Sequence, residues 1–387
     1  MLTRLLIKQS VYRSLLPFAT IFLTYLIFLN SAVVDRFTTE LQAGTLLVFS
    51  SITLIMGLKT YQWKWFVFSG VLVGALALTK AVFLYVGIGL ILVLLAQYSI
   101  RNLGDLKSKQ AFFRISALGI VFFVSIIPWI IRNYIKLDTL EFTERGGQVL
   151  LTRAYKNEMD ILGGIYYYSP SLIKVRIGPL LNYSSGDDEV GGPLQRLNRS
   201  NSSSFAEADD EAVQAGRPED VISYYEKAKA ERVRLVSYYS AQGVDDPDTL
   251  AEKAMQDEAI ELIGKNPFKH LVMSFVFMWR GMWCMSLYPD SLWGPRIILV
   301  INAFAYLAIW IMAIIGLWKR HPEMIGIAVL PVGAMSFYAL TSHYISRYSV
   351  PMIPNMIVAL VVGSTWIVEW ALSPNRRWFR RANKQNT

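Results

Sequence analysis

Long apolar stretches separated by short polar turns occupy both ends of this sequence. Eight of these stretches approach the length at which an α-helix, rising 1.5 Å per residue, crosses about 30 Å of hydrocarbon. A long polar segment separates the fifth stretch from the sixth. The pattern predicts an all-α polytopic membrane protein with about eight transmembrane helices and one large, mostly helical loop. The eight stretches are residues 16–30, 41–58, 65–79, 81–98, 113–131, 296–318, 324–341 and 348–370.

A ninth apolar stretch, residues 271–288, is long enough to span a membrane but carries Arg280 at its centre. A charged side chain there costs about 2.5–3.5 kcal/mol, which favours a helix lying in the membrane interface. Both chain termini are then on one side, with 16 Lys and Arg residues flanking the spans there and three on the other side. This asymmetry follows the positive-inside rule. We therefore predict cytoplasmic termini and an extracytoplasmic loop.

These boundaries divide the chain into five predicted parts. Residues 1–131 form an N-terminal five-helix membrane region, 132–268 the extracytoplasmic cap, 269–295 the interfacial helix, 296–371 a C-terminal three-helix membrane region and 372–387 a basic cytoplasmic tail. Within the cap, residues 219–242 and 248–263 are predicted helices, the second with Asp246 as its N-cap and Pro247 at its first position. The Gly-, Ser- and Asn-rich segment 184–204 is predicted to be a mobile lid.

Composition and charge support this division. Hydrophobic residues make up 53% and charged residues 17% of the 387 residues, which is atypical of a soluble enzyme. Of the 29 carboxylates, 23 lie between residues 133 and 268, so the cap is acidic. The net charge of +9 comes from basic residues scattered at helix ends, and this distribution predicts no nucleic-acid binding. The single cysteine excludes an intramolecular disulfide and a cysteine-rich metal site.

Ionisable residues that the predicted topology places at the outer membrane face form the candidate site, because such groups are costly in a span and usually have a function. Cations from separate turns suit an anionic head group, since arginine binds phosphate through two hydrogen bonds and lysine acts as a point charge. A single arginine at a helix end can instead simply extend to the interface. Lys80 fits that alternative poorly because it interrupts an apolar stretch. The residues concerned are Asp35, Arg36, Glu40, Lys80, Arg132, His343 and Arg347.

Five short motifs, in this order and spacing, resemble one family of membrane enzymes. They are Thr39-Glu40-Leu41 at the start of a span, the stretch from Gly70 through Gly74 to Thr79-Lys80, Pro128-Trp129 with Arg132-Asn133, Asn266-Pro267, and Arg347-Tyr348 followed by Pro351 and Pro354. Together they resemble the membrane-embedded glycosyltransferases of the GT-C type, in the branch of the protein O-mannosyltransferases and the lipid A aminoarabinose transferases. The resemblance extends over essentially the whole chain.

The resemblance implies transfer of a sugar from a polyprenyl-phosphate donor to a glycan, lipid or protein acceptor at the outer face of a bacterial inner membrane. It implies no certain cofactor and leaves a role for a divalent metal open. Lys80, Arg132 and Arg347 match positions at which the family places basic residues near the donor, and Glu40 matches a second acidic site. The predicted set of phosphate-binding residues is Lys80, Arg132, His343, Arg347 and Tyr348, and the predicted catalytic carboxylates are Glu40 and Asp35.

The physical logic of these roles is that a departing phosphate needs charge neutralisation and an acceptor hydroxyl or amine needs a carboxylate to take its proton. His343 fits the role of a general base as well as that of a hydrogen-bond donor to phosphate. The acidic segment 186–189 could hold a divalent cation, but a solvated turn explains it more simply.

One departure from the family pattern is large. The family carries its principal catalytic carboxylate in an outer loop that follows a first span, two or three spans before the position at which this chain begins. We therefore expect a C-terminal portion of a longer protein with little or no activity alone; otherwise Asp35 and Glu40 carry all the carboxylate chemistry. Two other classes stay open, a polymerase or ligase of surface polysaccharide and a non-catalytic lipid-binding subunit.

Overall fold

The computed structural model describes residues 38–99, 106–137, 139–140, 142, 146–188, 192–197, 205–283 and 295–372. Within these ranges every regular element is a helix, which confirms the predicted all-α class. The first predicted span, residues 16–30, and Asp35 lie outside the described ranges. The chain divides into two compact units. The first comprises Met1–Ile126, Leu287–Gly333 and Ser349–Thr387, and the second comprises Ile127–Ser286 and Ala334–Tyr348.

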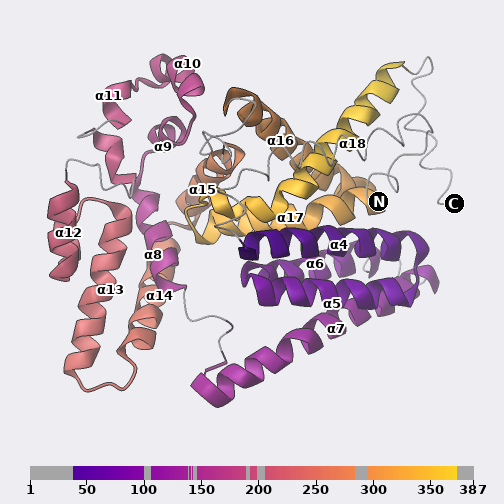
Figure 1. The fold of residues 1–387 in the computed structure, drawn as a ribbon, viewed down its shortest axis with the longest axis horizontal. Coiled ribbons are helices and arrows are strands. Elements are labelled where there is room, and N and C mark those ends of the chain that lie inside the picture. Colours follow the sequence, from indigo (N-terminus) through magenta and orange to yellow (C-terminus); the bar gives the residue numbers. More distant parts are fainter. Residues whose placement is uncertain are drawn as a thin grey trace. The chain divides into compact units, whose positions relative to one another are not determined.

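The other seven predicted apolar stretches all form helices (Figure 1). Five of these helices, α4, α7, α16, α17 and α18, are long and apolar enough to cross a membrane, and α5 and α6 are shorter apolar helices. The protein is therefore an all-helical integral membrane protein with five candidate spans among its described residues. The seven helices are α4 (Thr38–Thr60), α5 (Trp63–Thr79), α6 (Val82–Ser99), α7 (Leu106–Leu137), α16 (Pro295–Lys319), α17 (Pro322–Thr341) and α18 (Ile353–Leu372).

Polar contacts between helix ends establish the direction of several helices in the first unit. Lys59, near the end of α4, forms an ion pair with Glu323, at the start of α17. Gln97, near the end of α6, donates a hydrogen bond of 2.8 Å to the carbonyl oxygen of Leu317, near the end of α16. The ends of α4, α6 and α16 therefore lie at the same end of the unit as the start of α17. This is the end at which the sequence predicts cytoplasmic charges.

Two glycines allow α5 and α7 to pack closely. A Cβ atom added at Gly70 would lie 2.6 Å from the carbonyl oxygen of Leu118, and one added at Gly74 would lie 2.6 Å from the Cβ atom of Ser125. Real Cβ atoms do not approach other atoms so closely, so both positions require glycine unless a helix shifts. Because the residue numbers rise together along both helices, α5 and α7 run in the same direction.

The close approach of α5 and α7 gives the first prediction. Gly70→Ala should lower the free energy of unfolding by about 1–3 kcal/mol, because overpacking displaces a backbone. Gly89 on α6 is the matched control, since nothing lies within 4 Å of a Cβ atom there. Gly89→Ala should be neutral or stabilising by up to about 1 kcal/mol, because alanine is the better helix former. Equal losses for both variants in a denaturant titration would contradict the close packing.

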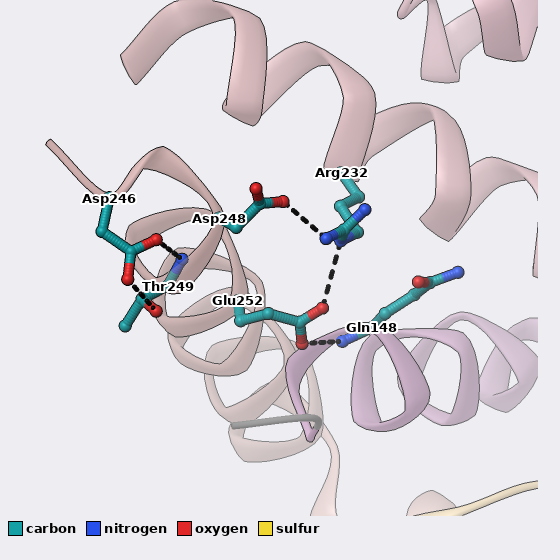
Figure 2. Close-up of polar contacts among 6 residues, drawn as sticks. All are labelled: Gln148, Arg232, Asp246, Asp248, Thr249 and Glu252. Atoms are coloured by element: carbon teal, nitrogen blue, oxygen red, sulfur yellow. Dashed lines mark hydrogen bonds and ion pairs between the residues drawn. The ribbon is translucent and has the colours of Figure 1, made fainter. Parts of the chain in front are cut away.

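In the second unit, α8 (Gly147–Tyr155), α13 (Tyr224–Ala241) and α14 (Pro247–Lys265) pack against one another. Figure 2 shows the polar junction that joins them. Arg232 on α13 donates to Asp248 at 2.6 Å and to Glu252 at 3.3 Å, both on α14. The other carboxylate oxygen of Glu252 accepts a hydrogen bond of 3.2 Å from the backbone N–H of Gln148 on α8. One arginine and one glutamate therefore connect three helices.

The predicted start of α14 is confirmed. Asp246 accepts hydrogen bonds from the backbone N–H and the hydroxyl of Thr249, at 3.1 and 2.7 Å, and Pro247 follows it (Figure 2). The helix predicted from residue 219 instead begins at Tyr224, because Pro218–Asp220 form a separate 3-10 turn. The other elements are η1 (Lys156–Glu158), α9 (Ile161–Tyr167), α10 (Ser171–Leu181), α11 (Ser185–Asp188), η2 (Pro193–Leu197), α12 (Ala206–Gln214) and η3 (Pro218–Asp220).

The predicted lid, residues 184–204, contains two of these short helices, α11 and η2. Leu194 and Leu197 of η2 are buried, so this part of the segment packs against the unit. Residues 189–191 and 198–204 lie outside the described ranges. Mobility of the segment stays a prediction.

The ninth apolar stretch begins in a helix with two distinct faces, α15 (Pro267–Met282). Asn266 caps its start by accepting a hydrogen bond of 3.0 Å from the backbone N–H of Lys269. One face of α15 is buried against the second unit, and the other carries large exposed apolar side chains. The buried face includes His270, Met273 and Phe277, and the exposed face includes Phe268, Leu271 and Phe275. An amphipathic helix of this kind is typical of an interface.

Candidate functional site

Two of the predicted site residues, Glu40 and Lys80, meet in the first unit. The ammonium group of Lys80 donates a hydrogen bond of 2.9 Å to Oε1 of Glu40, and the side chains are only 13% and 5% exposed, respectively. The hydroxyl of Thr39 donates to the other carboxylate oxygen at 2.8 Å. Both oxygens of this buried carboxylate therefore accept hydrogen bonds.

Local structure explains how these two residues come together. Glu40 lies in the first turn of α4, where the positive end of the helix dipole favours a carboxylate. Lys80 directly follows the last residue of α5 and has an extended backbone conformation, with φ −144° and ψ 116°. Because α4 and α5 are antiparallel neighbours, the start of one lies beside the end of the other. A carboxylate beside an ammonium group can accept a proton, and the ammonium group can neutralise an anion.

Arg132 lies near the end of α7 and belongs to the second unit. Its guanidinium donates a hydrogen bond of 2.9 Å to the side-chain oxygen of Asn133 and lies 4.8 Å from the ring centroid of Trp129. The side chain is exposed. This cation–π contact is typical of an arginine anchored at an interface and leaves the guanidinium accessible to an anion.

His343, Arg347 and Tyr348 follow α17 in the second unit, the last two in the 3-10 turn η5 (Ser346–Tyr348). The ring of Tyr348 stacks on Tyr338 with 4.2 Å between centroids and 10° between planes. The backbone carbonyl of His343 accepts a hydrogen bond of 2.6 Å from Arg280, and Arg347 is exposed. The contacts thus bring together one pair of predicted site residues, Glu40 and Lys80 in the first unit. The other described site residues, Arg132, His343, Arg347 and Tyr348, belong to the second unit.

The acidic segment 186–189 shows the geometry of a turn where the structure describes it. Asp187 accepts hydrogen bonds from the backbone N–H and the hydroxyl of Ser184, at 2.7 and 2.9 Å. Residue 189 lies outside the described ranges. Among the residues that are described, no group of three or more His, Cys, Asp or Glu side chains could hold a metal ion.

Sequence reasoning missed Arg153, which is fully buried in the second unit. Its Nε donates to the carbonyl oxygen of Ala339 at 3.0 Å and one terminal nitrogen donates to Asn157 at 2.6 Å. The other terminal nitrogen donates to the carbonyl of His270 at 3.0 Å and to the hydroxyl of Ser274 at 2.9 Å. Burial lowers the pKa of Arg153 to about 9. Nothing in the local sequence distinguishes this arginine from the other cations of residues 132–268.

Arg153 also affects the buried imidazole of His270, beside which it lies. Burial and then the charge of Arg153 lower the pKa of His270 from 6.5 to about 4. The amide nitrogen of Asn157 lies 3.1 Å from Nδ1 of the ring, which accepts its hydrogen bond when that nitrogen is unprotonated. The folded protein therefore holds His270 neutral at physiological pH.

This shift predicts a pH-dependent stability. Between pH 6.5 and about 4 the unfolded state protonates His270 and the folded state does not. The contribution of His270 to the free energy of unfolding is therefore fully present above pH 6.5. It is lost as the pH falls toward 4, by at most about 1.4 kcal/mol per pH unit. Denaturant titrations across this range should give a shallower pH dependence for His270→Gln than for the wild type. Identical slopes would show that His270 does not titrate as the structure indicates.

Comparison of the chain with protein-family models, with curated proteins and with solved structures finds no match. The assignment of a function therefore depends on the residues and contacts described above.

Proposed function

We propose that this protein is a membrane-embedded transferase that moves a sugar from a polyprenyl-phosphate donor to a glycan, lipid or protein acceptor. The observation that carries the proposal is the buried pair of Glu40 and Lys80, whose atoms lie 2.9 Å apart although the residues are 40 positions apart in the sequence. The pair supplies the two groups that such a transfer needs, a carboxylate for the proton of the acceptor and a cation for the departing phosphate.

In the proposed reaction, an acceptor oxygen or nitrogen attacks the anomeric carbon of the donor sugar and forms the new glycosidic bond. The bond between that carbon and the phosphate oxygen breaks, and the oxygen keeps the electron pair. Glu40 takes the proton of the acceptor, and Lys80 stabilises the negative charge on the leaving phosphate. We propose Arg132, His343, Arg347 and Tyr348 as further phosphate-binding residues and Asp35 as a second carboxylate. Whether a divalent metal assists stays open.

The helix directions in the first unit support the membrane arrangement that we propose, with eight spans and cytoplasmic termini. The helix α7 runs parallel to α5, toward the end that holds Glu40 and Lys80, and α16 runs away from that end toward Leu317. The chain between α7 and α16 therefore leaves and re-enters the first unit at the same end. A return of this kind supports an interfacial α15, and we propose on this basis that residues 132–268 lie outside the cytoplasm, at an inner membrane of bacterial type.

Donor binding provides the test of this proposal. The full chain would be reconstituted in vesicles that contain a labelled polyprenyl-phosphate sugar, and both donor affinity and donor turnover would be measured. Lys80→Ala should weaken donor binding by about 10- to 100-fold, as expected for the loss of a charge-assisted contact. Arg347→Ala should weaken it less. Glu40→Gln should retain donor binding and lose any turnover that the wild-type chain shows.

The control is Lys174→Ala. Lys174 lies over the rings of Tyr166 and Tyr167 and is neither a predicted phosphate-binding residue nor a predicted catalytic residue. It should leave donor affinity unchanged. Unchanged affinity in both Lys80→Ala and Arg347→Ala would contradict the phosphate site. Donor binding that depends on Lys80 but is equally tight for a polyprenyl phosphate without a sugar would favour a lipid-binding subunit, and polymer-length changes with Glu40→Gln would favour a polymerase.

A further inference from the structure

Two arginines contact a pair of neighbouring aromatic rings inside the second unit. The guanidinium of Arg153 lies 4.5 Å from the ring centroid of Phe277, and Phe277 lies 5.8 Å from the ring centroid of Tyr168. The guanidinium of Arg280 in turn lies 4.6 Å from the ring centroid of Tyr168. This arrangement brings two arginines that are far apart in sequence to the same aromatic pair.

Lys156 lies one helical turn after Arg153 and is only 2% exposed. Its ammonium group can donate three hydrogen bonds, and the one acceptor among the described residues is the carbonyl oxygen of Leu197, at the long distance of 3.5 Å. Burial lowers the pKa of Lys156 well below its ordinary value, and repulsion by Arg280 and Arg153 lowers it further. Among the described residues, no carboxylate forms an ion pair with Lys156 or Arg153.

Arg153 and Lys156 differ in the hydrogen-bond acceptors that surround them. Protein groups accept hydrogen bonds from all three guanidinium nitrogens of Arg153, so this residue is held by the fold. Within the described ranges, Lys156 has no comparable set of acceptors. A buried charge without a partner costs several kcal/mol, so either the amine is neutral or an anion completes its surroundings. Arg280, which contacts Tyr168 in the same unit, is only partly buried.

We propose that Lys156 and Arg280 bind the phosphate or pyrophosphate group of a ligand in the second unit, with Arg153 as a fixed neighbour that adds positive potential. An ammonium and a guanidinium are the two side-chain cations best suited to phosphate oxygens. None of these three residues belongs to the donor set proposed above, and all three lie in the second unit, unlike Glu40 and Lys80. The inference therefore goes beyond the proposed transferase and stands if Glu40 proves to have no catalytic role.

The test measures stabilisation of the full chain by anions. The protein would be placed in nanodiscs of zwitterionic lipid and its unfolding midpoint followed against inorganic phosphate and pyrophosphate, with chloride at equal ionic strength. A parallel series would add a polyprenyl phosphate to the lipid. A ligand that binds only the folded state raises the midpoint in a saturable way. We expect such a rise for the wild type with at least one phosphate compound and none with chloride.

Lys156→Met should weaken the apparent phosphate affinity by about tenfold or more, as the loss of a charged contact requires. Lys174→Met, which removes a cation elsewhere in the same unit, should not change it. If Lys156→Met does not fold, Arg280→Gln replaces a cation that is less buried than Lys156 and should weaken the same response. A response to free phosphate identifies a soluble ligand, and a response to the lipid alone identifies a lipid head group. No saturable rise in the wild type, or equal affinities in wild type and variants, would overturn the site and leave Lys156 as a neutral buried lysine.

Discussion

Arg153→Met is expected to destabilise the second unit by about 3–5 kcal/mol, because it leaves several buried acceptors without donors at once. The carbonyl oxygens of Ala339 and His270 and the amide oxygen of Asn157 all accept hydrogen bonds from this guanidinium. Water cannot easily replace a side chain that is completely buried. The measurement is the resistance of the second unit to limited proteolysis, together with the free energy of unfolding in denaturant.

Arg176→Met is the matched control for this change, because Arg176 is an exposed cation in the same unit. Its replacement should leave stability within about 0.5 kcal/mol of the wild type. Arg153→Lys should recover only part of the loss, since an ammonium group cannot reproduce the planar fork that reaches α15 and α17 together. A loss of less than about 1 kcal/mol for Arg153→Met would show that these hydrogen bonds do not organise the unit.

Replacing either member of the pair of Glu40 and Lys80 should also lower the free energy of unfolding strongly, and this is the second large effect that we expect. Lys80→Met leaves the Glu40 carboxylate buried without its cation, and removal of one partner of a buried pair costs about 3–5 kcal/mol. Glu40→Gln should be destabilising for the converse reason. The double variant Glu40→Gln/Lys80→Met leaves no isolated charge, so it should be more stable than Lys80→Met alone.

The double variant also separates a structural role of the pair from a catalytic one. If the pair only stabilises the fold, the double variant should recover stability and donor turnover together. If the proposed transferase is correct, stability should return while turnover stays lost. Glu261 and Lys265, an exposed pair one turn apart on α14, provide the reference cycle, which should show weak coupling. Independent, additive effects of Glu40→Gln and Lys80→Met would contradict the contact.

The local pattern of the sequence predicted much of the fold because the responsible forces are local. Apolar length alone located α4 to α7 and α16 to α18, since backbone groups in hydrocarbon must be satisfied within a helix. Asp246 and Pro247 located the start of α14 because a cap acts within one turn. The start of α13 was placed too early, because Pro218 begins a separate 3-10 turn that helical periodicity does not distinguish.

The candidate site was predictable only in part. Alternating spans placed the start of α4 and the end of α5 at one face, and this led to Glu40 and Lys80 before any contact was known. The cations of the second unit could not be found in this way. Arg153 and Arg280 contact the neighbouring rings of Phe277 and Tyr168 although they are 127 positions apart in the sequence, and only packing brings them together.

The sequence by itself determined which segments are apolar helices and in which part of the chain the carboxylates are concentrated. These properties depend on composition and on neighbours within a few residues. Only the tertiary structure decided which charges are buried, which are paired, and that Arg153 is held by groups from α15 and α17. The reason is physical: the free energy of a charge depends on the atoms that replace its water, and distant parts of the chain supply those atoms.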